Sequence, residues 1–467
     1  MTAGMERADL PAELEAVVPL VDFDGEGYRL GYALSARFRT RSTLAISTRR
    51  RIPPPPRPLR SRPSNPDPAM PPALGRNTVV LALAQAINGS LAPISISLGG
   101  LAGYALLGPD KGLATAPVTG YNVGVALASL PAALLMRRVG RRAGFMTGAS
   151  IGACGGLLAA YAITVASFWL FALGLFVVGT AGSFVQQYRF AAVDGAEGPA
   201  KGRVIGWVLA GGLIAAVVGP QTAIHTRDLL APIPFAGAFL GLAGLAAVGC
   251  LVLAFLRPPP LPATAAPAGG GRPLGEIVRQ PTFVVAVACA VGSYALMSFV
   301  MTAAPLAMVA AGCTTDEATL GIQWHVMAMF GPSFVTGNLV ARFGARRVIA
   351  VGLGILGTCA LVALSGTTLA HFWGTLILLG VGWNLGFIGA TTLLTETYAP
   401  EEKNKAQGAN DVVLFGTVAL ASFSSGQILN AFGWSTVAAF VLPVIALCLA
   451  ALGWLGLRGR AAVRSAV

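Results

Sequence analysis

The chain has 467 residues, of which 55% are hydrophobic and only 11% charged, and its formal net charge is +13. Soluble domains carry roughly 25% charged residues. A water-facing surface around so large a core would need more polar cover. The composition therefore excludes one large soluble domain and predicts a protein that crosses the membrane many times. It also argues against nucleic-acid binding, which needs a basic face on a folded soluble domain.

The first 75 residues differ from the rest of the chain. Residues 1–70 hold eight of the nineteen acidic residues, and residues 51–68 read RIPPPPRPLRSRPSNPDP. Proline-rich sequence of mixed charge cannot bury enough apolar surface to fold. We therefore expect 1–75 to be a disordered cytoplasmic tail, and Met70 is a second candidate for the start of translation.

The chain beyond this tail contains apolar stretches of about 20 residues, the length of a membrane-spanning helix. They fall into two sets of six. This predicts an all-α polytopic membrane protein with about twelve transmembrane helices in two pseudo-symmetric six-helix bundles. The first set lies near 77–100, 112–136, 143–165, 167–191, 203–224 and 231–256, and the second near 281–304, 317–340, 346–366, 370–395, 407–430 and 434–457.

The charges in the connecting loops indicate an orientation. When the loops are assigned alternately to two sides, only Lys111 and Arg227 fall on one side, and every other Lys and Arg after residue 76 falls on the other. An excess of Lys and Arg marks cytoplasmic loops. We therefore expect both termini in the cytoplasm and the protein in the plasma membrane, which is the inner membrane in a bacterium.

A second soluble segment interrupts the apolar region near its middle. Residues 257–280 are rich in Pro, Gly and Ala, a composition typical of a linker. This cytoplasmic linker separates two expected bundles at 76–256 and 281–458. Residues 459–467 are expected to form a second cytoplasmic tail.

The two halves repeat a basic turn. MRRVGRRAG at 136–144 and VARFGARRV at 340–348 place Gly140 and Gly344 204 residues apart, each between the second and third helix of its half. A second repeat, Asp194 to Arg203 and Glu396 to Lys405, has an offset of 202. Internal repeats of this size indicate a secondary transporter whose site lies between the halves.

These turns resemble the signature of the major facilitator superfamily, which reads roughly G-x-L-a-D-R-x-G-R-R/K between helices 2 and 3. The signature's aspartate is replaced in both copies, by Arg137 and Ala341. The resemblance covers about 76–458 and implies that family's fold and its transport by alternating access. The second copy matches at Gly337, Leu339, Arg342, Gly344, Arg346 and Arg347, and the first at Leu135, Arg138, Gly140, Arg141 and Arg142.

The arginines of these turns can meet the negative ends of helix dipoles and carboxylates on neighbouring helices. We expect them to latch the cytoplasmic side in one alternating-access state. The alternative is that their charge does no more than set the topology. The expected latch comprises Arg138, Gly140, Arg141, Arg142, Asp194, Arg203, Arg342, Gly344, Arg346, Arg347, Glu396 and Lys405.

Polar residues within the spans outline a candidate substrate cavity. Amides without partners are costly in hydrocarbon, so they should face other helices or water. Interhelical hydrogen bonds are the alternative explanation. Neutral amides beside aromatic rings suit a planar or weakly charged organic solute. The resembling family lines its cavity with helices 1, 4, 7 and 10. The candidates are Gln85, Asn88, Tyr121, Asn122, Gln186, Arg189, Tyr294, Trp324, Trp383 and Asn384.

Two ionisable residues are candidates for proton coupling. His325 lies in the eighth span and has an ordinary pKa near neutrality, which suits a proton relay. Asp411 lies about one turn into the eleventh span. The alternatives are that His325 is a packing residue and that Asp411 pairs with Lys405 or with the arginines of the first half.

The function that the sequence predicts is secondary active transport of a small organic solute, coupled to protons and carried out by a monomer in the lipid bilayer. Efflux of a drug or metabolite is the alternative to uptake. A non-transporting membrane sensor or assembly protein is the alternative of another class. No P-loop is present, so ATP-driven transport is unsupported. We expect no enzymatic activity, cofactor, metal site or nucleic-acid partner.

Overall fold

The computed structural model describes residues 75–193, 200–257 and 271–465, and three strands nearer the start of the chain. The chain divides into two compact units, 1–73 and 74–467. In the first unit, β1 (Leu14–Phe23), β2 (Tyr28–Ala36) and β3 (Ala45–Ser47) form an antiparallel sheet in the order β1-β2-β3. The sequence analysis predicted a disordered tail at 1–75 and did not predict these strands. The other residues of that range, up to 74, lie outside the described residues, as does most of the predicted linker.

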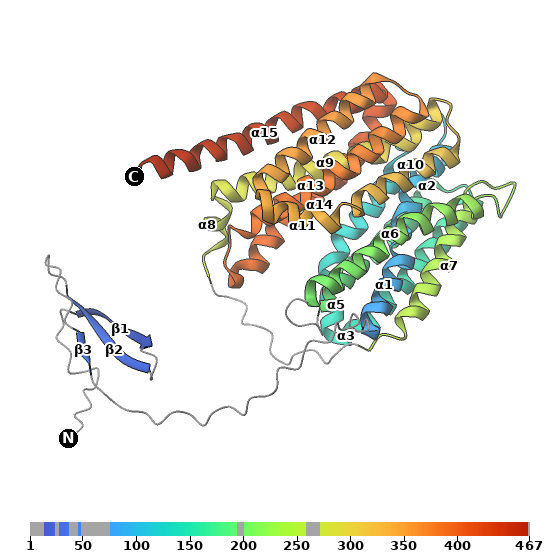
Figure 1. Cartoon of the computed structure of the whole chain (residues 1–467). Helices are drawn as coiled ribbons and strands as arrows, with labels where there is room; N and C mark the ends of the chain where they lie inside the picture. The colour runs from blue at the N-terminus through green and yellow to red at the C-terminus, as the bar shows by residue number, and fades with distance from the viewer. Residues whose placement is uncertain are drawn as a thin grey trace, which may run out of the picture. The chain divides into compact units, whose positions relative to one another are not determined.

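The second unit is helical throughout its described residues (Figure 1). The helices of the first half are α1 (Arg76–Asn88), α2 (Leu91–Leu106), α3 (Ala116–Thr164), α4 (Phe168–Val185), α5 (Tyr188–Val193), α6 (Ala200–Thr226) and α7 (Ala236–Leu253). Those of the second half are α8 (Leu274–Val278), α9 (Pro281–Ala310), α10 (Thr315–Phe330), α11 (Ser333–Phe343), α12 (Ala345–Ser365), α13 (Leu369–Thr395), the short 3₁₀ helix η2 (Pro400–Glu402), α14 (Lys403–Phe432) and α15 (Trp434–Ser465).

Ten helices within the described residues are long and apolar enough to cross a membrane. The expected number of about twelve is reached in two ways. One of the ten helices, α3, contains two spans. A further span is divided between two helices, α10 and α11, that are each too short to be counted among the ten. In α3 the backbone at Gly140 has φ 85° and ψ 163°, so the chain reverses there. The eighth span is divided into α10 and α11 at Gly331 and Pro332, where the proline cannot donate a helical hydrogen bond.

The two sets of helices lie side by side, blue to yellow-green for the first half and yellow to red for the second (Figure 1). The second set has its own core, which includes Leu353 and Leu356 of α12 and Leu376 and Leu379 of α13. Small residues let these two helices approach closely: a Cβ on Gly352 would lie 2.3 Å from the backbone nitrogen of Gly386. The last helix, α15, continues to Ser465, so most of the predicted tail at 459–467 extends it.

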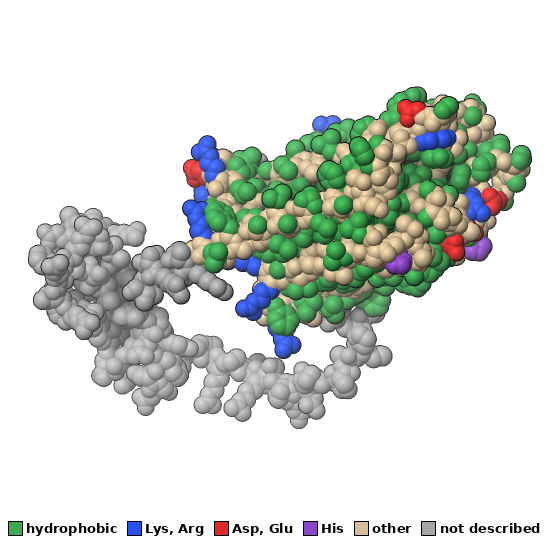
Figure 2. All heavy atoms as spheres, turned by 90° about the horizontal axis from the view of Figure 1, so that it is seen from above, with side chains coloured by type: hydrophobic (Ala, Val, Ile, Leu, Met, Phe, Trp, Pro, Cys, Tyr) green, Lys and Arg blue, Asp and Glu red, His purple; other side chains and the backbone are tan. Residues whose placement is uncertain are grey.

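Lys and Arg side chains gather at one end of the helical unit (Figure 2). We call this the basic end. It carries the turns at Gly140 and Gly344, the linker residues next to α8, and the start of α14. Between the two ends, the face shown in Figure 2 carries hydrophobic and other uncharged groups and few charged side chains, as expected for a surface in contact with lipid.

Candidate functional site

The two basic turns have the same backbone conformation. Gly344 has φ 83° and ψ 148°, close to the values at Gly140. This region of conformational space is open essentially to glycine alone. The predicted equivalence of the two turns is therefore also present in their geometry. Arg138, Arg142 and Arg346 are exposed at the basic end.

The expected partners of these arginines are only partly described. Asp194 lies outside the described residues, and nothing is described of the Arg203 side chain. Glu396 is exposed and lines one recess together with Arg346 and Arg347. Whether these groups act as a latch stays a prediction.

A different ion pair holds the linker at this end, and the sequence analysis missed it. The Arg272 guanidinium donates to both carboxylate oxygens of Glu402, from Nε at 2.9 Å and from Nη2 at 2.7 Å. Glu402 also accepts from the backbone N–H groups of Arg272 and Ala399. Its side chain is only 2% exposed. The hydrogen bond from Arg272, followed by those backbone donors, lowers the pKa of Glu402 to about 2.

Lys405, predicted as part of the latch, joins this linker contact. Its Nζ donates to the backbone carbonyl of Arg272 at 3.2 Å. No local sequence signal links Arg272 to Glu402, because the two lie 130 residues apart in charged loops. Only the folded chain brings them together.

Two of the predicted cavity residues, Tyr294 and Trp383, meet in an aromatic cluster. The ring of Tyr294 on α9 is nearly perpendicular to those of Trp383 and Phe387 of α13, with ring centroids 5.4 and 5.2 Å apart. Trp383 and Phe387 are stacked at 5.3 Å. Phe415 of α14 lies 6.3 Å from Tyr294. All four rings are half-buried, so the cluster keeps surface available for a planar ligand.

Charged side chains lie opposite this cluster. Arg189 of α5, in the first half, interacts electrostatically with Tyr294 and with Asp411 of α14, both in the second half. Arg189 and Asp411 are exposed to solvent, and the amide of Asn410 donates to Asp411 at 3.0 Å. Because Arg189 and Asp411 belong to different halves and interact electrostatically, the region between the halves at this level, beside the aromatic cluster, is the candidate polar site.

Other cavity candidates are used for packing within one half. Asn88 donates to the hydroxyl of Tyr188 at 3.1 Å and is buried. Asn384 is fully buried and donates to the backbone carbonyl of Met329 at 2.7 Å and to the Ser333 hydroxyl at 2.6 Å. It thereby ties α13 to the break between α10 and α11, which is the role of an interhelical hydrogen bond.

The remaining candidates are spread over other surfaces. Tyr121 is buried, and a Cβ on Gly182 of α4 would lie 2.9 Å from its hydroxyl. Gln85 is half-buried beside α6, Gln186 is exposed at the end of α4, and Asn122 is half-buried on α3. Trp324 is 39% exposed and packs against Trp373, with ring centroids 6.5 Å apart.

His325 lies inside the second half, away from the charged pair at Arg189. It is fully buried, and its Nδ1 is 2.8 Å from the backbone oxygen of Leu376 on α13. Its Nε2 is buried and has no hydrogen-bond partner within the described residues. The imidazole therefore bridges α10 and α13.

The two halves contact each other toward the end opposite the basic turns. Arg227, after α6, forms an ion pair with Asp316 of α10. Gln221 donates to Gln323 at 3.0 Å. Arg227 also bonds to its neighbour Asp228 and holds the pKa of that carboxyl below its ordinary value. We call these contacts the non-basic gate.

Next to this gate, α3 and α14 are in close contact. The Thr119 hydroxyl of α3 lies 3.4 Å from that of Ser422 on α14, and a Cβ on Gly426 would collide with Thr115. These contacts join the halves at the end opposite the basic turns.

The family model for the Major Facilitator Superfamily matches residues 73–333 and 324–466. The chain belongs to this family. Membership confirms the predicted resemblance and makes the chain an integral membrane transporter of this fold rather than an enzyme.

Two curated relatives and one solved structure are similar to the chain. The riboflavin transporter RfnT of Brucella anthropi is 52% identical over 378 residues, covering 81% of this chain and 95% of the relative. The uncharacterized MFS-type transporter YddS of Bacillus subtilis is 29% identical over 370 residues, covering 75% and 84%. An auto-inhibited POT family peptide transporter shares the fold, with a TM-score of 0.58 at 14% identity, and covers 82% of this chain and 97% of that one.

Proposed function

We propose that this protein carries riboflavin, or a closely similar flat and uncharged solute, across the plasma membrane by alternating access. The observation that supports this most directly is the aromatic cluster of Tyr294, Trp383, Phe387 and Phe415 beside Arg189 and Asp411. The 52% identity to a riboflavin transporter over nearly that relative's whole length supports riboflavin as the ligand.

The chemistry of riboflavin matches this arrangement. Its ring system is planar and heteroaromatic, and stacking a base-like ring on an aromatic side chain contributes about 1–3 kcal/mol. Its ring carbonyls accept hydrogen bonds, for which the Arg189 guanidinium and the Tyr294 hydroxyl are donors. Its ring N–H and side-chain hydroxyls donate, for which Asp411 is an acceptor. Riboflavin is uncharged at neutral pH, so Arg189 and Asp411 remain a balanced pair when it binds.

The transport cycle in this proposal uses protons and the two ends in turn. The basic end faces the cytoplasm, with both termini on that side, and the protein acts as a monomer. When the non-basic gate opens, the arginines of the basic turns latch the cytoplasmic side through Asp194, Arg203, Glu396 and Lys405. Asp411, which is exposed beside the site, takes up and releases the coupled proton in preference to the enclosed His325.

Riboflavin binding and flux test this function. Purified protein should quench flavin fluorescence, and proteoliposomes should accumulate riboflavin when a pH gradient is imposed. Trp383→Ala should weaken binding by about fivefold or more, because it removes a stacking surface worth about 1–3 kcal/mol. Trp324→Ala, which removes the same side chain from a different surface, should bind like the parent.

The outcomes separate the alternatives. Riboflavin flux only out of the compartment that corresponds to the cytoplasm would assign efflux. Binding without flux in either direction would favour the membrane sensor. Absence of riboflavin binding by the folded parent protein would contradict the proposed substrate.

A further inference from the structure

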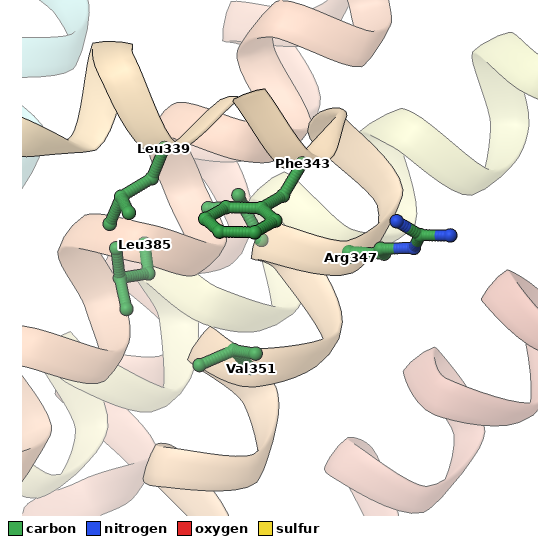
Figure 3. A pocket seen from close by; sticks show the side chains of 6 residues that line it. Leu339, Phe343, Arg347, Val351 and Leu385 are labelled. Carbon is green, nitrogen blue, oxygen red and sulfur yellow. The ribbon is translucent and has the colours of Figure 1, made fainter. Parts of the chain in front are cut away.

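An apolar groove opens on the outer flank of the second half. It has a volume of about 340 Å³ and is lined by Leu339 and Phe343 of α11, Arg347, Val348 and Val351 of α12, and Leu385 of α13. In Figure 3, Leu339, Phe343, Leu385 and Val351 surround the open space, and Arg347 extends away from it at one side. Apart from Arg347, every lining side chain is apolar.

The groove faces the membrane rather than the space between the halves. The helices against which α12 packs, namely α9, α11, α13 and α15, all belong to the second half. Val351 is 56% exposed and Phe343 is 45% exposed. Exposed apolar side chains on the flank of a membrane protein are in contact with lipid chains rather than water.

A basic recess continues the groove at the basic end. This recess is lined by Arg346, Arg347 and Glu396, with Phe343 and Gly344, and it shares Phe343 and Arg347 with the groove. Arg346 and Arg347 are exposed there, and Glu396 is the only carboxylate among the described residues that line the recess. The first turn of α12 also begins at Gly344, and the N-terminus of a helix favours a phosphate group.

The combination of these two surfaces identifies the occupant. An acyl chain fits the apolar groove, and a phosphate fits the basic recess at its end. A free phosphate would leave the groove unfilled, and a hydrocarbon would leave the arginines without a partner. Glu396 disfavours a second negative charge, so a headgroup with a single phosphate fits best.

We propose that this groove binds one anionic phospholipid, with an acyl chain along Leu339, Val351 and Leu385 and its phosphate at Arg346 and Arg347. The lipid would come from the membrane leaflet at the basic end. Because the site lies on the outer flank, it is separate from the proposed riboflavin site.

Native mass spectrometry of the full chain, delipidated in detergent and titrated with phosphatidylglycerol or with phosphatidylcholine of the same acyl chains, tests this proposal. The parent should retain one phosphatidylglycerol in preference to phosphatidylcholine. A juxtamembrane arginine contributes about 1 kcal/mol to binding an anionic lipid, which is about fivefold. The variants Arg346→Gln and Arg347→Gln should therefore each weaken retention of phosphatidylglycerol about fivefold.

Two further variants keep the test specific. Arg137→Gln with Arg138→Gln removes two charges, one more than either single variant, from exposed positions at the equivalent turn of the first half and should leave retention unchanged. Val351→Trp should fill the groove and lower retention of both lipids while the arginines stay in place. Its position is exposed, so the variant should still fold, which a single symmetric elution peak would verify.

Three results would overturn the proposal. The first is unchanged retention in both arginine variants. The second is an equal loss in the Arg137 and Arg138 control, which would indicate attraction to the basic surface as a whole. The third is displacement of the lipid by millimolar inorganic phosphate, which would indicate an anion site alone.

Discussion

At the scale of single residues, the two candidates for proton coupling have different surroundings. Asp411 is exposed and interacts electrostatically with Arg189 across the space between the halves. His325 is fully buried between α10 and α13. Ionisable groups within membrane-spanning helices are rare and typically functional where they face a water-filled cavity. By this criterion we propose Asp411 as the coupling residue and His325 as a packing residue.

We therefore expect Asp411→Asn to abolish the stimulation of uptake by a pH gradient. Exchange of labelled riboflavin at equal concentrations on both sides should survive, because exchange need not release the proton. His325→Gln should keep the parent's pH profile and lower only the thermal stability. Uptake and exchange in proteoliposomes measure both effects. A lost pH profile in His325→Gln, with a normal profile in Asp411→Asn, would reverse the assignment.

The sequence singled out candidate site residues whose chemistry is unusual within an apolar span. Tyr294 and Trp383 stand out as polar aromatic residues within apolar spans, and they do meet. Asn384 is adjacent to Trp383 in sequence, but successive residues of a helix point about 100° apart. It therefore faces α10 and α11 instead of the aromatic cluster. Sequence shows that a polar side chain needs a partner, but it does not show which neighbour supplies it.

At the scale of elements, glycine determines where the chain reverses at the basic end. A side chain at φ 83° and ψ 148°, the values at Gly344, costs about 1–3 kcal/mol. Gly344→Ala should therefore destabilise the protein by that amount, measured as a lower midpoint of thermal unfolding in detergent. Gly357→Ala, in the middle of α12 with open space around it, should be neutral or stabilising because alanine favours a helix. Equal midpoints in the two variants would contradict this explanation of the turn.

The linker contact is the element that the sequence could not predict. Its composition indicated a flexible connection, yet Arg272, α8 and Glu402 fasten its second part to the second half. Ile277 of α8 is fully buried, which adds an apolar contact to the ion pair. One buried carboxylate and one buried isoleucine therefore give a fixed end to a segment that is otherwise rich in Pro and Gly.

Glu402→Gln should release this end of the linker. Arg272 pairs with the ionised carboxylate, and the pKa of Glu402 is lowered to about 2. A lowered pKa means that the contact stabilises the protein fully above the ordinary carboxyl pKa, about 4.3, and loses this effect only as the pH falls toward 2. Proteolysis near Arg272 should thus be slow and constant in the parent between about pH 5.5 and 8 and faster in Glu402→Gln. The variant Glu401→Gln, at an exposed neighbour, is the control and should be cleaved like the parent.

At the scale of the whole molecule, the repeated turns predicted two equivalent halves, and both turns have the same geometry. The sequence could not predict at which end the halves meet. Conformational states of one protein differ by only a few kcal/mol, so in the proposed transport cycle a small number of contacts would decide which end is closed. In this structure those contacts include Arg227 with Asp316 and Gln221 with Gln323.

The ion pair between Arg227 and Asp316 in the non-basic gate can be tested by substitution. Arg227 and Asp316 are 21% and 45% exposed, and an ion pair this accessible contributes at most about 1 kcal/mol. Asp316→Asn should raise the population open at that end by up to about fivefold. In a cysteine-free background, Ser422→Cys, buried beside Thr119, should react correspondingly faster with a membrane-impermeant maleimide.

The control is Asp228→Asn. It removes the other carboxylate that pairs with Arg227, which lies in the same half as the arginine, and should not change that labelling rate. Because salt screens exposed pairs, 1 M NaCl should bring the parent close to Asp316→Asn. Equal labelling rates in Asp316→Asn and Asp228→Asn would show that this pair does not hold the gate closed.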